Sequence, residues 1–578
     1  MTSGSPTTRP IGPYERLAAE VHEWDPRTVE VASMVADLIR AHRADLVVEH
    51  IGSTSVPGLP GKGIVDLSIE TSPADIPGVV AMLYELGFQP QPGPDPWPPT
   101  RPMPVGSLDL DGTKYRIHLH VQPHGGDFPR DIAFRDALRD DPELRRQYED
   151  LKRGITDSGP VEGLRYTHSK TAWILQVYRR LGFAPPPISP PSTIGILGGG
   201  QLGRMLALAG RELGYRIAVL DPDPDAPAAS VADRIEVATY DDVVAAQRLA
   251  AECSVITYEL EHVGQAVVAA LDDRRRPIRP GPYPLKLTAD RLAERRFVEA
   301  NEGTVATWRE VGSPAAVLEG AAELGYPVRV KAVRGGYDGR SQVRIDRTDG
   351  IEALDGRLGW PALLERELAF EAELSVVVVR NVDGVSRTFP LARNRHDRGI
   401  LVETVVPAGV PAAIEEEAAS LAKNLATSMG LVGTLTVELF LMPDGSLIVN
   451  ELAPRVHNSG HWSIEGAVTS QFEQHLRAIC GLPLGSVEMR APAVAMVNLL
   501  GEGAPRPAHP TGIYAALDVP DAHLHLYDKH TVFERRKMGH VTALGATPAE
   551  ALSRATEAAG HIDWAPAAAV AAGPAAEP

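Results

Sequence analysis

Residues 434–452 have the sequence Thr-Leu-Thr-Val-Glu-Leu-Phe-Leu-Met-Pro-Asp-Gly-Ser-Leu-Ile-Val-Asn-Glu-Leu, which predicts a β-hairpin. Apolar and β-branched residues form a first strand up to Met442, a Pro-Asp-Gly-Ser turn follows, and a second strand starts at Leu447. If the turn is centred on its Asp-Gly pair, Met442 pairs with Leu447. Counting back along both strands then places Glu438 directly opposite Glu451.

Two facing glutamates are an unusual feature of a hairpin, because like charges in that position destabilise a sheet. A divalent cation held between the two carboxylates would reverse the sign of this interaction. The hairpin alone leaves an alternative open, in which the register slips or both glutamates lie on a solvent-exposed face. The metal hypothesis assigns Glu438 and Glu451 as its ligands.

Composition limits the classes of protein to which the chain can belong. Its 578 residues suggest three or four domains, and a formal net charge of −18 argues against a general nucleic-acid or membrane-surface role. It has only two cysteines, too few for a disulfide framework or a cysteine metal cluster. No N-terminal signal-like segment and no apolar run of membrane-spanning length occurs, so we expect a soluble cytoplasmic protein.

Proline-rich and alanine-rich stretches indicate how the chain is divided. Residues 185–192 are predicted to form a stiff linker, and residues 564–578 an Ala/Pro-rich disordered tail. Residues 1–184 combine an amphipathic helix at 31–42 with strands that include 63–70 and 115–121, which predicts an α+β domain.

The segment after the linker predicts a βαβ unit and a parallel sheet. A strand at 193–197 leads into Gly198-Gly-Gly-Gln-Leu-Gly203, then a helix, then a strand that ends at Asp221. This glycine pattern also fits dinucleotide binding, with Asp221 on the ribose, and so supports an NAD-dependent oxidoreductase as an alternative. Glycines at a helix N-terminus are equally compatible with another phosphate, or with none.

Further segments suggest a nucleotide site. A strand ends in Lys331 just before a glycine-rich loop at 334–342, where the lysine and loop amides can hold phosphates, although the loop alone also fits a simple turn. The connector at 365–368 can offer backbone groups to an adenine, and Glu373 can reach a ribose hydroxyl. Donor-rich residues follow the hairpin at 453–462, and cations near 526–540 suit a phosphate monoester.

Taken in order, these segments resemble the ATP-grasp superfamily and, within it, the family of N5-carboxyaminoimidazole ribonucleotide synthetases. The resemblance covers about residues 193–563. Its most specific parts are the run from Asn450 to Trp462 and the Arg-Lys-Met-Gly-His sequence at 536–540. The motifs that carry it are Gly198 to Gly203, Thr257 to His262, Asp290 to Leu292, Gly335 to Arg340, Asn450-Glu451, Arg455 to Trp462, Met496 to Gly501 and Arg536 to His540.

The resemblance implies a multidomain α/β and α+β architecture. After the N-terminal domain, we expect a Rossmann-like pre-ATP-grasp domain at 193–288, an ATP-grasp domain at 289–490 and a small C-terminal β-rich domain at 491–563. The first of these then belongs to the scaffold and need not bind NAD. The implied activity is ATP-dependent carboxylation of aminoimidazole ribonucleotide with bicarbonate, in purine biosynthesis, by a homodimer.

The resemblance also implies the site residues. Magnesium is expected on Glu438 and Glu451. Residues implied to bind ATP are Arg291, Lys331, Gly336, Tyr337, Asp338, Gly339, Arg340, Ser341, Gln342, Glu365, Arg366, Glu367, Leu368, Glu373, His396, Asn450 and Glu451. Residues implied to hold aminoimidazole ribonucleotide are Glu259, Tyr337, Asp338, Arg455, His457, Ser459, Lys529, Arg536 and Lys537. Those implied to act in catalysis are Arg455, Lys331, Tyr337 and Asp338.

Two positions depart from the family pattern. Ser341 stands where the glycine-rich loop usually has a second glycine, and Arg295 stands where a lysine is common, so charge is kept but geometry is not. A formate-dependent transformylase of the same superfamily stays open as a second alternative function.

The N-terminal residues resemble the GrpB-like family, whose fold is similar to that of nucleotidyltransferases. The segments that carry this resemblance are 49–66, 116–120, 134–136 and 166–170. The second acid that a two-metal site requires is missing after Asp66, although Glu70 lies on the same strand face. One hypothesis is therefore a phosphate or metal pocket, and the other is a non-catalytic binding or assembly module. The pocket would use Ser53, Lys62, Asp66, His118 and His120.

Overall fold

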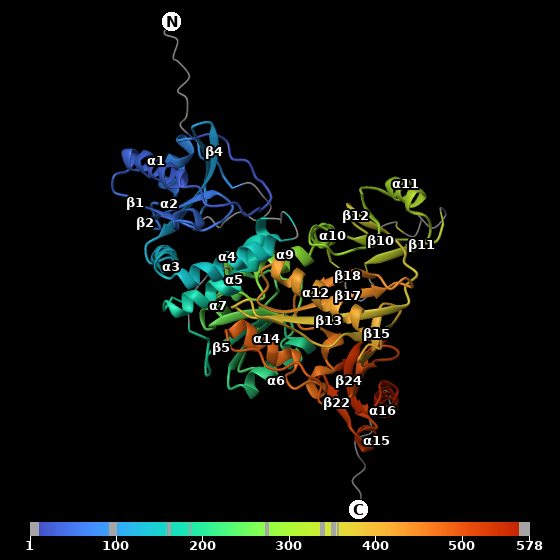
Figure 1. Cartoon of the computed structure of the whole chain (residues 1–578). Helices are drawn as coiled ribbons and strands as arrows, with labels where there is room; N and C mark the ends of the chain where they lie inside the picture. Colours follow the sequence, from blue (N-terminus) through green and yellow to red (C-terminus); the bar gives the residue numbers. More distant parts are fainter. Residues whose placement is uncertain are drawn as a thin grey trace, which may run out of the picture. The chain divides into compact units, whose positions relative to one another are not determined.

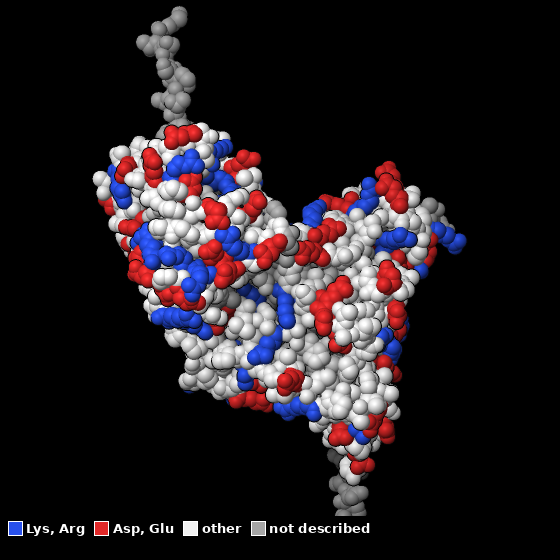
Figure 2. All heavy atoms as spheres, in the orientation of Figure 1, with Lys and Arg blue, Asp and Glu red and all other residues white. Residues whose placement is uncertain are grey.

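The computed structural model describes residues 11–91, 101–157, 159, 163–183, 186–271, 277–335, 341–347, 354 and 358–565. The chain forms two compact units, Met1–Pro185 and Pro186–Pro578 (Figure 1). Among the described residues, no helix has the length and apolar composition needed to cross a membrane. Acidic and basic side chains are interspersed on the face shown in Figure 2, so the net negative charge is not gathered in one place there.

The first unit is the expected α+β domain, built on a sheet of order β1-β2-β4-β3. Strands β2 and β4 are parallel, and the outer pairs are antiparallel. The strands are β1 (Val47–Ile51), β2 (Ile64–Thr71), β3 (Val105–Leu110) and β4 (Thr113–Pro123). The helices are α1 (Arg27–His42), α2 (Ile76–Glu85), α3 (Phe128–Asp140), α4 (Pro142–Thr156) and α5 (Gly163–Arg180), with a short 3-10 turn η1 (Ser53–Ser55).

The two faces of this sheet differ in chemistry because side chains alternate along a strand. Val65, Leu67 and Ile69 of β2 are fully buried in one core with apolar residues of α1 and α2. The intervening side chains of β2 and β4 are polar and point to the other face. Helix α3 contacts β1 and β2, and a second apolar cluster, which includes Tyr148, joins α3, α4 and α5. The polar face therefore lies toward a helical layer.

The second unit begins with a parallel sheet of order β7-β6-β5-β8, which confirms the predicted βαβ beginning. The proline-rich stretch before it is tied to this unit, because the Ile188 amide donates to the Cys480 carbonyl and the Tyr215 hydroxyl donates to the Ile188 carbonyl. The elements are β5 (Thr193–Leu197), α6 (Gln201–Glu212), β6 (Arg216–Asp221), β7 (Arg234–Val237), α7 (Val243–Ala251), β8 (Val255–Tyr258), α8 (Gln265–Leu271) and α9 (Pro282–Thr288).

Next comes an antiparallel sheet of order β11-β10-β12-β9, whose apolar side chains pack against α11. The strand predicted to end at Lys331 is confirmed as β10, which ends one residue later, at Ala332. The elements are α10 (Arg291–Ala300), β9 (Trp308–Val311), α11 (Pro314–Leu324), β10 (Val328–Ala332), β11 (Gln342–Ile345) and β12 (Ala362–Arg366).

Most of the remaining strands form a large sheet of order β18-β17-β13-β15-β16-β19-β24-β22, in which β14 also pairs with β13. Strand β20 pairs with β23, and β21 with β25, in two small antiparallel sheets. Helix α12 packs against β13 and β17 (Figure 1). The elements up to α14 are β13 (Ala372–Arg380), β14 (Ser386–Thr388), β15 (Ala392–Asp397), β16 (Ile400–Val406), α12 (Ala412–Ser428), β17 (Gly433–Leu441), β18 (Leu447–Ala453), η3 (Asn458–Gly460), α13 (Ser463–Gly466) and α14 (Gln471–Cys480).

The C-terminal residues complete this sheet and add α16, whose alanines pack on β19 and β24, and α15, which contacts α16 and β22. Strand β25 ends at Trp564, the residue at which the disordered tail was predicted to begin, and the Trp564 side chain is buried. The elements are β19 (Ala493–Leu500), β20 (Arg506–Pro507), β21 (Pro510–Thr511), α15 (Ile513–Asp518), β22 (Ala522–Leu526), β23 (Thr531–Val532), β24 (Lys537–Gly545), α16 (Pro548–His561) and β25 (Asp563–Trp564).

Candidate active site

The β17–β18 hairpin places Glu438 opposite Glu451, as the sequence predicted. The predicted pairing of Met442 with Leu447 is wrong, because Leu441 pairs with Leu447 and the turn is one residue longer. A β-bulge next to Glu438 compensates: the pairs are Leu439 with Val449 and then Glu438 with Glu451, so Asn450 is the extra residue of β18. The bulge restores the facing glutamates and turns the Asn450 amide toward Glu438.

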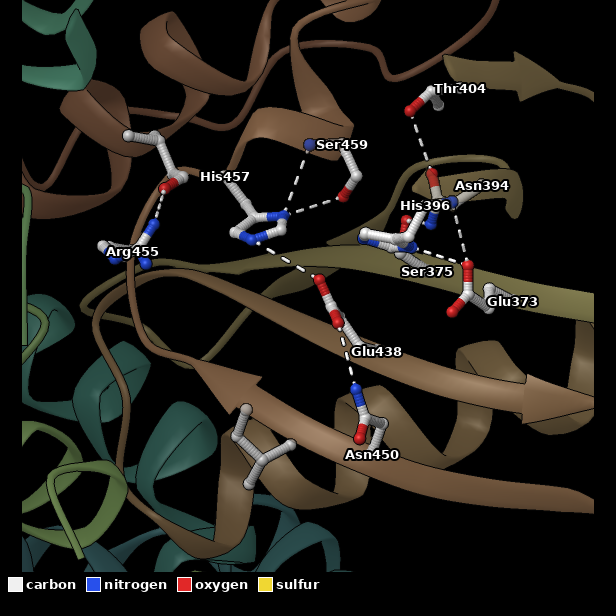
Figure 3. A network of polar contacts seen from close by, with 12 residues as sticks. Glu373, Ser375, Asn394, His396, Thr404, Glu438, Asn450, Arg455, His457 and Ser459 are labelled. Carbon is white, nitrogen blue, oxygen red and sulfur yellow. Dashed lines mark hydrogen bonds and ion pairs between the residues drawn. The ribbon is translucent and has the colours of Figure 1, made fainter. Parts of the chain in front are cut away.

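Glu438 lies at the centre of a polar network (Figure 3). Its carboxylate accepts a hydrogen bond from the Asn450 side chain at 3.3 Å and lies 3.5 Å from Nε2 of His457. Burial, and next the charge of Glu451, raises the pKa of Glu438 to about 7. The molecule therefore holds together two carboxylates that repel each other, and a cation between them would remove that repulsion.

The donor set at this point suits magnesium. Glu438, Glu451 and the Asn450 amide offer oxygen atoms, the ligands that hard divalent cations prefer. Glu451 is exposed, so its carboxylate is open to a ligand from solvent, whereas Glu438 is mostly covered. The residues present therefore fit a Mg²⁺ ion that also contacts phosphate oxygens.

Lys331 is linked to this hairpin through a buried chain of charges. Its Nζ lies 2.6 Å from Oε2 of Glu365, and Nε of Arg295 lies 2.6 Å from Oε1 of the same carboxylate. Arg295 also pairs with Glu294 at 3.0 Å, and Glu294 accepts a hydrogen bond from the amide of Leu452. Burial alone would raise the pKa of Glu365, but Lys331 and Arg295 outweigh it and lower that pKa to about 2.

The side chain of Glu365, the first residue of the connector expected to offer backbone groups to an adenine, is buried and ion-paired with Lys331. It therefore positions Lys331, which leaves the expected backbone role untouched. Glu367, in the same connector, pairs with Arg329 and Arg344 on neighbouring strands. The backbone groups of the connector stay the predicted adenine partners.

Glu373 and His396 form a close pair on β13 and β15. Nδ1 of His396 lies 2.6 Å from Oε2 of Glu373, and the backbone amide of His396 donates a hydrogen bond to the same oxygen at 3.1 Å (Figure 3). Burial lowers the pKa of His396, but Glu373 and Glu438 outweigh it, so the net shift is upward. Behind them, Asn394 donates to Ser375 and accepts from Thr404, and Ser375 pairs with Glu438 in the sheet. Hydrogen-bonded side chains thus fix this side of the site.

The glycine loop after β5 is filled by carboxylates of the protein itself. Glu259 accepts hydrogen bonds from the amides of Gly200 and Gly203, at 2.7 and 2.6 Å, and Asp221 accepts one from Gly199 at 2.7 Å. A Cβ at Gly200 would lie 2.6 Å from Oε1 of Glu259, so only glycine allows this close approach. The anion-binding end of α6 therefore holds Glu259, which contradicts the NAD alternative.

Arg455 connects the loop carboxylates to the hairpin. Its Nε lies 2.7 Å from Oε1 of Glu261. Burial opposes the charge of Arg455, but Glu261, Glu451 and Glu259 outweigh it and raise the pKa of the guanidinium. Nδ1 of the neighbouring His457 lies 2.9 Å from Oγ of Ser459. The structure thus brings together the donors expected after the hairpin.

The predicted substrate cations lie in two places. Lys529 donates to Oε1 of Gln201 at the start of α6 and to the carbonyl of Lys537. The charge of Lys537 contributes to the lowered pKa of His457, so this lysine faces the hairpin side. Arg536 stacks 5.1 Å over the Phe533 ring, and burial lowers its pKa. Lys529 therefore borders the N-terminal end of α6 and Lys537 the hairpin side, whereas Arg536 lies against Phe533.

Some expected ligands lie outside the described residues, and others were missed. Gly336, Tyr337, Asp338, Gly339 and Arg340 belong to the first group, whereas Ser341 is described and its carbonyl accepts a hydrogen bond from the Ala332 amide. Sequence reasoning gave no role to Glu261 or Glu294, which hold Arg455 and Arg295. Glu261 lies inside the Thr257 to His262 motif, whereas nothing in the sequence marks Glu294.

In the first unit, Asp66, His118 and His120 come together, with atoms close enough to ligate one metal ion. Ser53 lies 3.4 Å from Nζ of the buried Lys152, and the Nζ of Lys62 lies over the ring of Tyr166. Glu70, the expected substitute acid, instead lies 3.6 Å from His124. The structure therefore brings together three of the five predicted pocket residues, Asp66, His118 and His120.

The parallel sheet, the two larger antiparallel sheets and the paired carboxylates, which a buried chain of charges links to Lys331, define an ATP-grasp protein. Family models agree: a ribonucleotide synthetase preATP-grasp domain matches residues 192–289, an ATP-grasp domain matches 296–472, and a phosphoribosylaminoimidazole carboxylase C-terminal domain matches 494–554. A GrpB protein model matches residues 18–180, so the first unit is a GrpB domain. From residue 192 onward, the chain belongs to the N5-carboxyaminoimidazole ribonucleotide synthase family.

Relatives and solved structures give the extent of the similarity. The N5-carboxyaminoimidazole ribonucleotide synthase of Bacillus subtilis is 41% identical over 356 residues, which are 61% of this chain and 92% of that protein. The ADP complex of an N5-carboxyaminoimidazole ribonucleotide synthetase is similar with a TM-score of 0.60 and 41% identity, over 64% of this chain and 97% of the other. An Aspergillus clavatus enzyme in complex with ADP and 5-aminoimidazole ribonucleotide has a TM-score of 0.59 and 31% identity, over 65% and 98%.

Proposed function

We propose that the second unit catalyses the ATP-dependent carboxylation of 5-aminoimidazole ribonucleotide by bicarbonate, giving N5-carboxyaminoimidazole ribonucleotide, ADP and phosphate in purine biosynthesis. The observation that carries the proposal is the cluster in which Arg455 lies among Glu259, Glu261 and Glu451 while Glu438 faces Glu451. This cluster supports the proposal because the carboxylates proposed to act on the nucleotide side influence the charge of Arg455, which is expected to hold the imidazole substrate. The names of the relatives, and the ligands in their structures, support the same substrates.

The chemistry divides into two steps that share one site. A bicarbonate oxygen attacks the γ-phosphorus of ATP, the bond to the β–γ bridging oxygen breaks, and carboxyphosphate and ADP form. The exocyclic amine of aminoimidazole ribonucleotide then attacks the carboxyl carbon, or carbon dioxide released from it, and phosphate leaves. The amine loses a proton in this step. The protein contributes position and charge more than covalent chemistry.

The residues divide this work by location. Lys331, held by Glu365, is proposed to neutralise phosphate charge, and Glu373 and His396 to bind the ribose side of ATP. Arg455 is proposed to hold the reacting carboxyl group, since it is charged, buried and fixed by Glu261. The other residues implied above, including Tyr337 and Asp338, stay predictions.

Magnesium is proposed to bind Glu438 and Glu451, where it would neutralise charge on the ATP phosphates. Their oxygen donors, and the raised pKa of Glu438, are what support this assignment. A homodimer and a cytoplasmic location also stay predictions.

The test is ADP release by the full chain with bicarbonate, with and without aminoimidazole ribonucleotide. We expect stimulation by aminoimidazole ribonucleotide, formation of the carboxylated product, and no product when formate replaces bicarbonate. A formate-dependent transformylase would reverse the last result. An NAD-dependent oxidoreductase would change NADH absorbance without ATP, and stimulation by neither substrate would contradict the proposal.

A further inference from the structure

Part of the polar face of the sheet in the GrpB domain is buried, which is unusual for a strand face of this composition. Ser68 and Gln122 on that face are almost fully buried, and Gln122 donates to Ser68 and to Asp131 of α3. Each of these two side chains therefore has a partner within the layer. Closer to the start of the same strands, the face carries Asp66 of β2 and His118 of β4, which pair directly in the parallel register.

Three side chains converge there because of strand geometry. Residues at i and i+2 point to one face, so His120 lies beside His118 on β4, and both face Asp66 on β2. Nδ1 of His118 lies 3.4 Å from Oδ1 of Asp66, and Nε2 of His120 lies 3.3 Å from the same oxygen. All three candidate ligand atoms lie within 4.8 Å of one another.

These separations have the size of a metal coordination sphere. Metal–ligand bonds of about 2.0–2.2 Å at tetrahedral angles put neighbouring ligand atoms about 3.3–3.6 Å apart. The Asp66 contacts to both histidines fall in this range. Two imidazoles and one carboxylate favour zinc or a similar borderline ion over magnesium, which prefers oxygen ligands alone.

Groups around the three side chains hold them in place. Nε2 of His118, the ring nitrogen on the far side from Asp66, lies 3.0 Å from the hydroxyl of Tyr14, the kind of contact that orients a metal-ligating histidine. The backbone at Gly52 approaches so closely that a Cβ there would lie 2.5 Å from Oδ2 of Asp66. With φ at +73°, Gly52 adopts a conformation that side-chain-bearing residues avoid. The local backbone is therefore shaped around this carboxylate.

We propose that the GrpB domain binds one zinc-like transition-metal ion through Asp66, His118 and His120. Three protein ligands leave a fourth coordination position for water or a substrate oxygen, as in catalytic rather than structural zinc sites. The site is separate from the carboxylate hairpin of the other unit in both residues and donor chemistry. It gives the GrpB domain a metal-dependent property of its own.

The experiment is a Co²⁺ titration of the full chain, prepared without a histidine tag and stripped with a chelator. Excess Mg²⁺ is present throughout, so that the carboxylate hairpin does not take up the probe. We expect one equivalent of Co²⁺ to produce the visible absorption of a tetrahedral nitrogen- and oxygen-ligated ion, and Zn²⁺ to displace it. Failure of the wild-type chain to bind either ion would overturn the proposal.

Variants identify the ligands. His120→Gln and Asp66→Asn are expected to weaken binding by at least about 100-fold, and Tyr14→Phe by about tenfold. The matched control is His124→Gln, since His124 lies just past the end of β4 and its side chain is 64% exposed. If His120→Gln binds Co²⁺ as tightly as His124→Gln does, the assignment is wrong.

A measurement on the wild-type chain avoids dependence on variants that fail to fold. Zn²⁺ should protect His118 and His120 from diethyl pyrocarbonate, read by peptide mass spectrometry, while His124 stays reactive. If Zn²⁺ leaves the modification of His118 and His120 unchanged, the proposal is overturned, because liganded ring nitrogens cannot react.

Discussion

Glu438 and Glu451 face each other across the β17–β18 ladder, immediately beside the bulge that Asn450 creates. Like charges at such a pair oppose each other, so this relationship is unfavourable in the protein alone and favourable once a divalent cation lies between them. The bulge also turns the Asn450 amide to within 3.3 Å of Glu438. The strand geometry thus sets the position of the predicted cation site.

Glu451→Gln is predicted to separate stability from activity. Removing one of two like charges should leave the metal-free protein equally or more stable in urea, while ADP release stimulated by aminoimidazole ribonucleotide falls roughly 100-fold. Mg²⁺ should also cease to raise the urea midpoint. The control is Glu416→Gln, an exposed position on α12. Near-normal stimulated ADP release by Glu451→Gln would contradict the metal assignment.

Glu261→Gln tests how Arg455 is positioned. The two side chains are 2.7 Å apart, and loss of the carboxylate removes the group that fixes the guanidinium. We expect kcat for carboxylation to fall about 10- to 100-fold with little change in the KM for ATP, because ATP binding uses other residues. Arg455→Lys should also lose activity, although it keeps the positive charge, since an ammonium lacks the planar fork of a guanidinium. A variant that changes only the KM for ATP would show that this pair serves the nucleotide instead.

Arg295 bridges two buried carboxylates, Glu294 and Glu365, and is itself almost fully buried. Arg295→Met should lower the free energy of unfolding by about 3–5 kcal/mol, because it leaves buried charges without a partner. Arg295→Lys keeps the charge but cannot pair with both carboxylates at once, so its loss should be smaller. Urea unfolding measures both. Equal stability of the Met variant and the wild type would show that the bridge contributes nothing net.

The local parts of this architecture could be predicted from the sequence. Strand, glycine loop and helix after residue 192 follow from short-range patterns, and so does the hairpin with its two glutamates. The exact ladder could not be predicted, because a bulge at Asn450 changes the count by one residue and leaves no mark in a run of strand-forming residues. Two offsets of one residue, in the turn and at the bulge, cancelled at Glu438 and Glu451.

Contacts between residues far apart in the chain could not be predicted from the sequence. Arg455 and Glu261 are separated by 194 residues, and Glu294 and Leu452 by 158, so nothing in either local sequence links them. The glycine loop shows the same limit. Its spacing fits a dinucleotide, but the folded chain places Glu259 on the amides that would bind a phosphate. The sequence pattern reported the backbone geometry correctly and left the identity of the anion undetermined.

Acid sensitivity is the last prediction, and it rests on His475. This fully buried side chain accepts a hydrogen bond at Nδ1 from the amide of Thr434, and its Nε2 lies 2.8 Å from the hydroxyl of Thr257. Burial lowers its pKa from 6.5 to about 3. At acidic pH the unfolded chain therefore binds a proton at His475 that the folded chain does not bind. The contribution of neutral His475 to folding stability is complete above about pH 6.5 and is lost as the pH falls toward 3. Below pH 6 this residue should make the free energy of unfolding fall by about 1.4 kcal/mol per pH unit. His475→Asn should remove this contribution, whereas the control His523→Gln, at an exposed position, should leave it in place. Urea unfolding from pH 7.5 to 5 measures both. Identical slopes for the wild type and His475→Asn would show that the folded state accepts the proton after all.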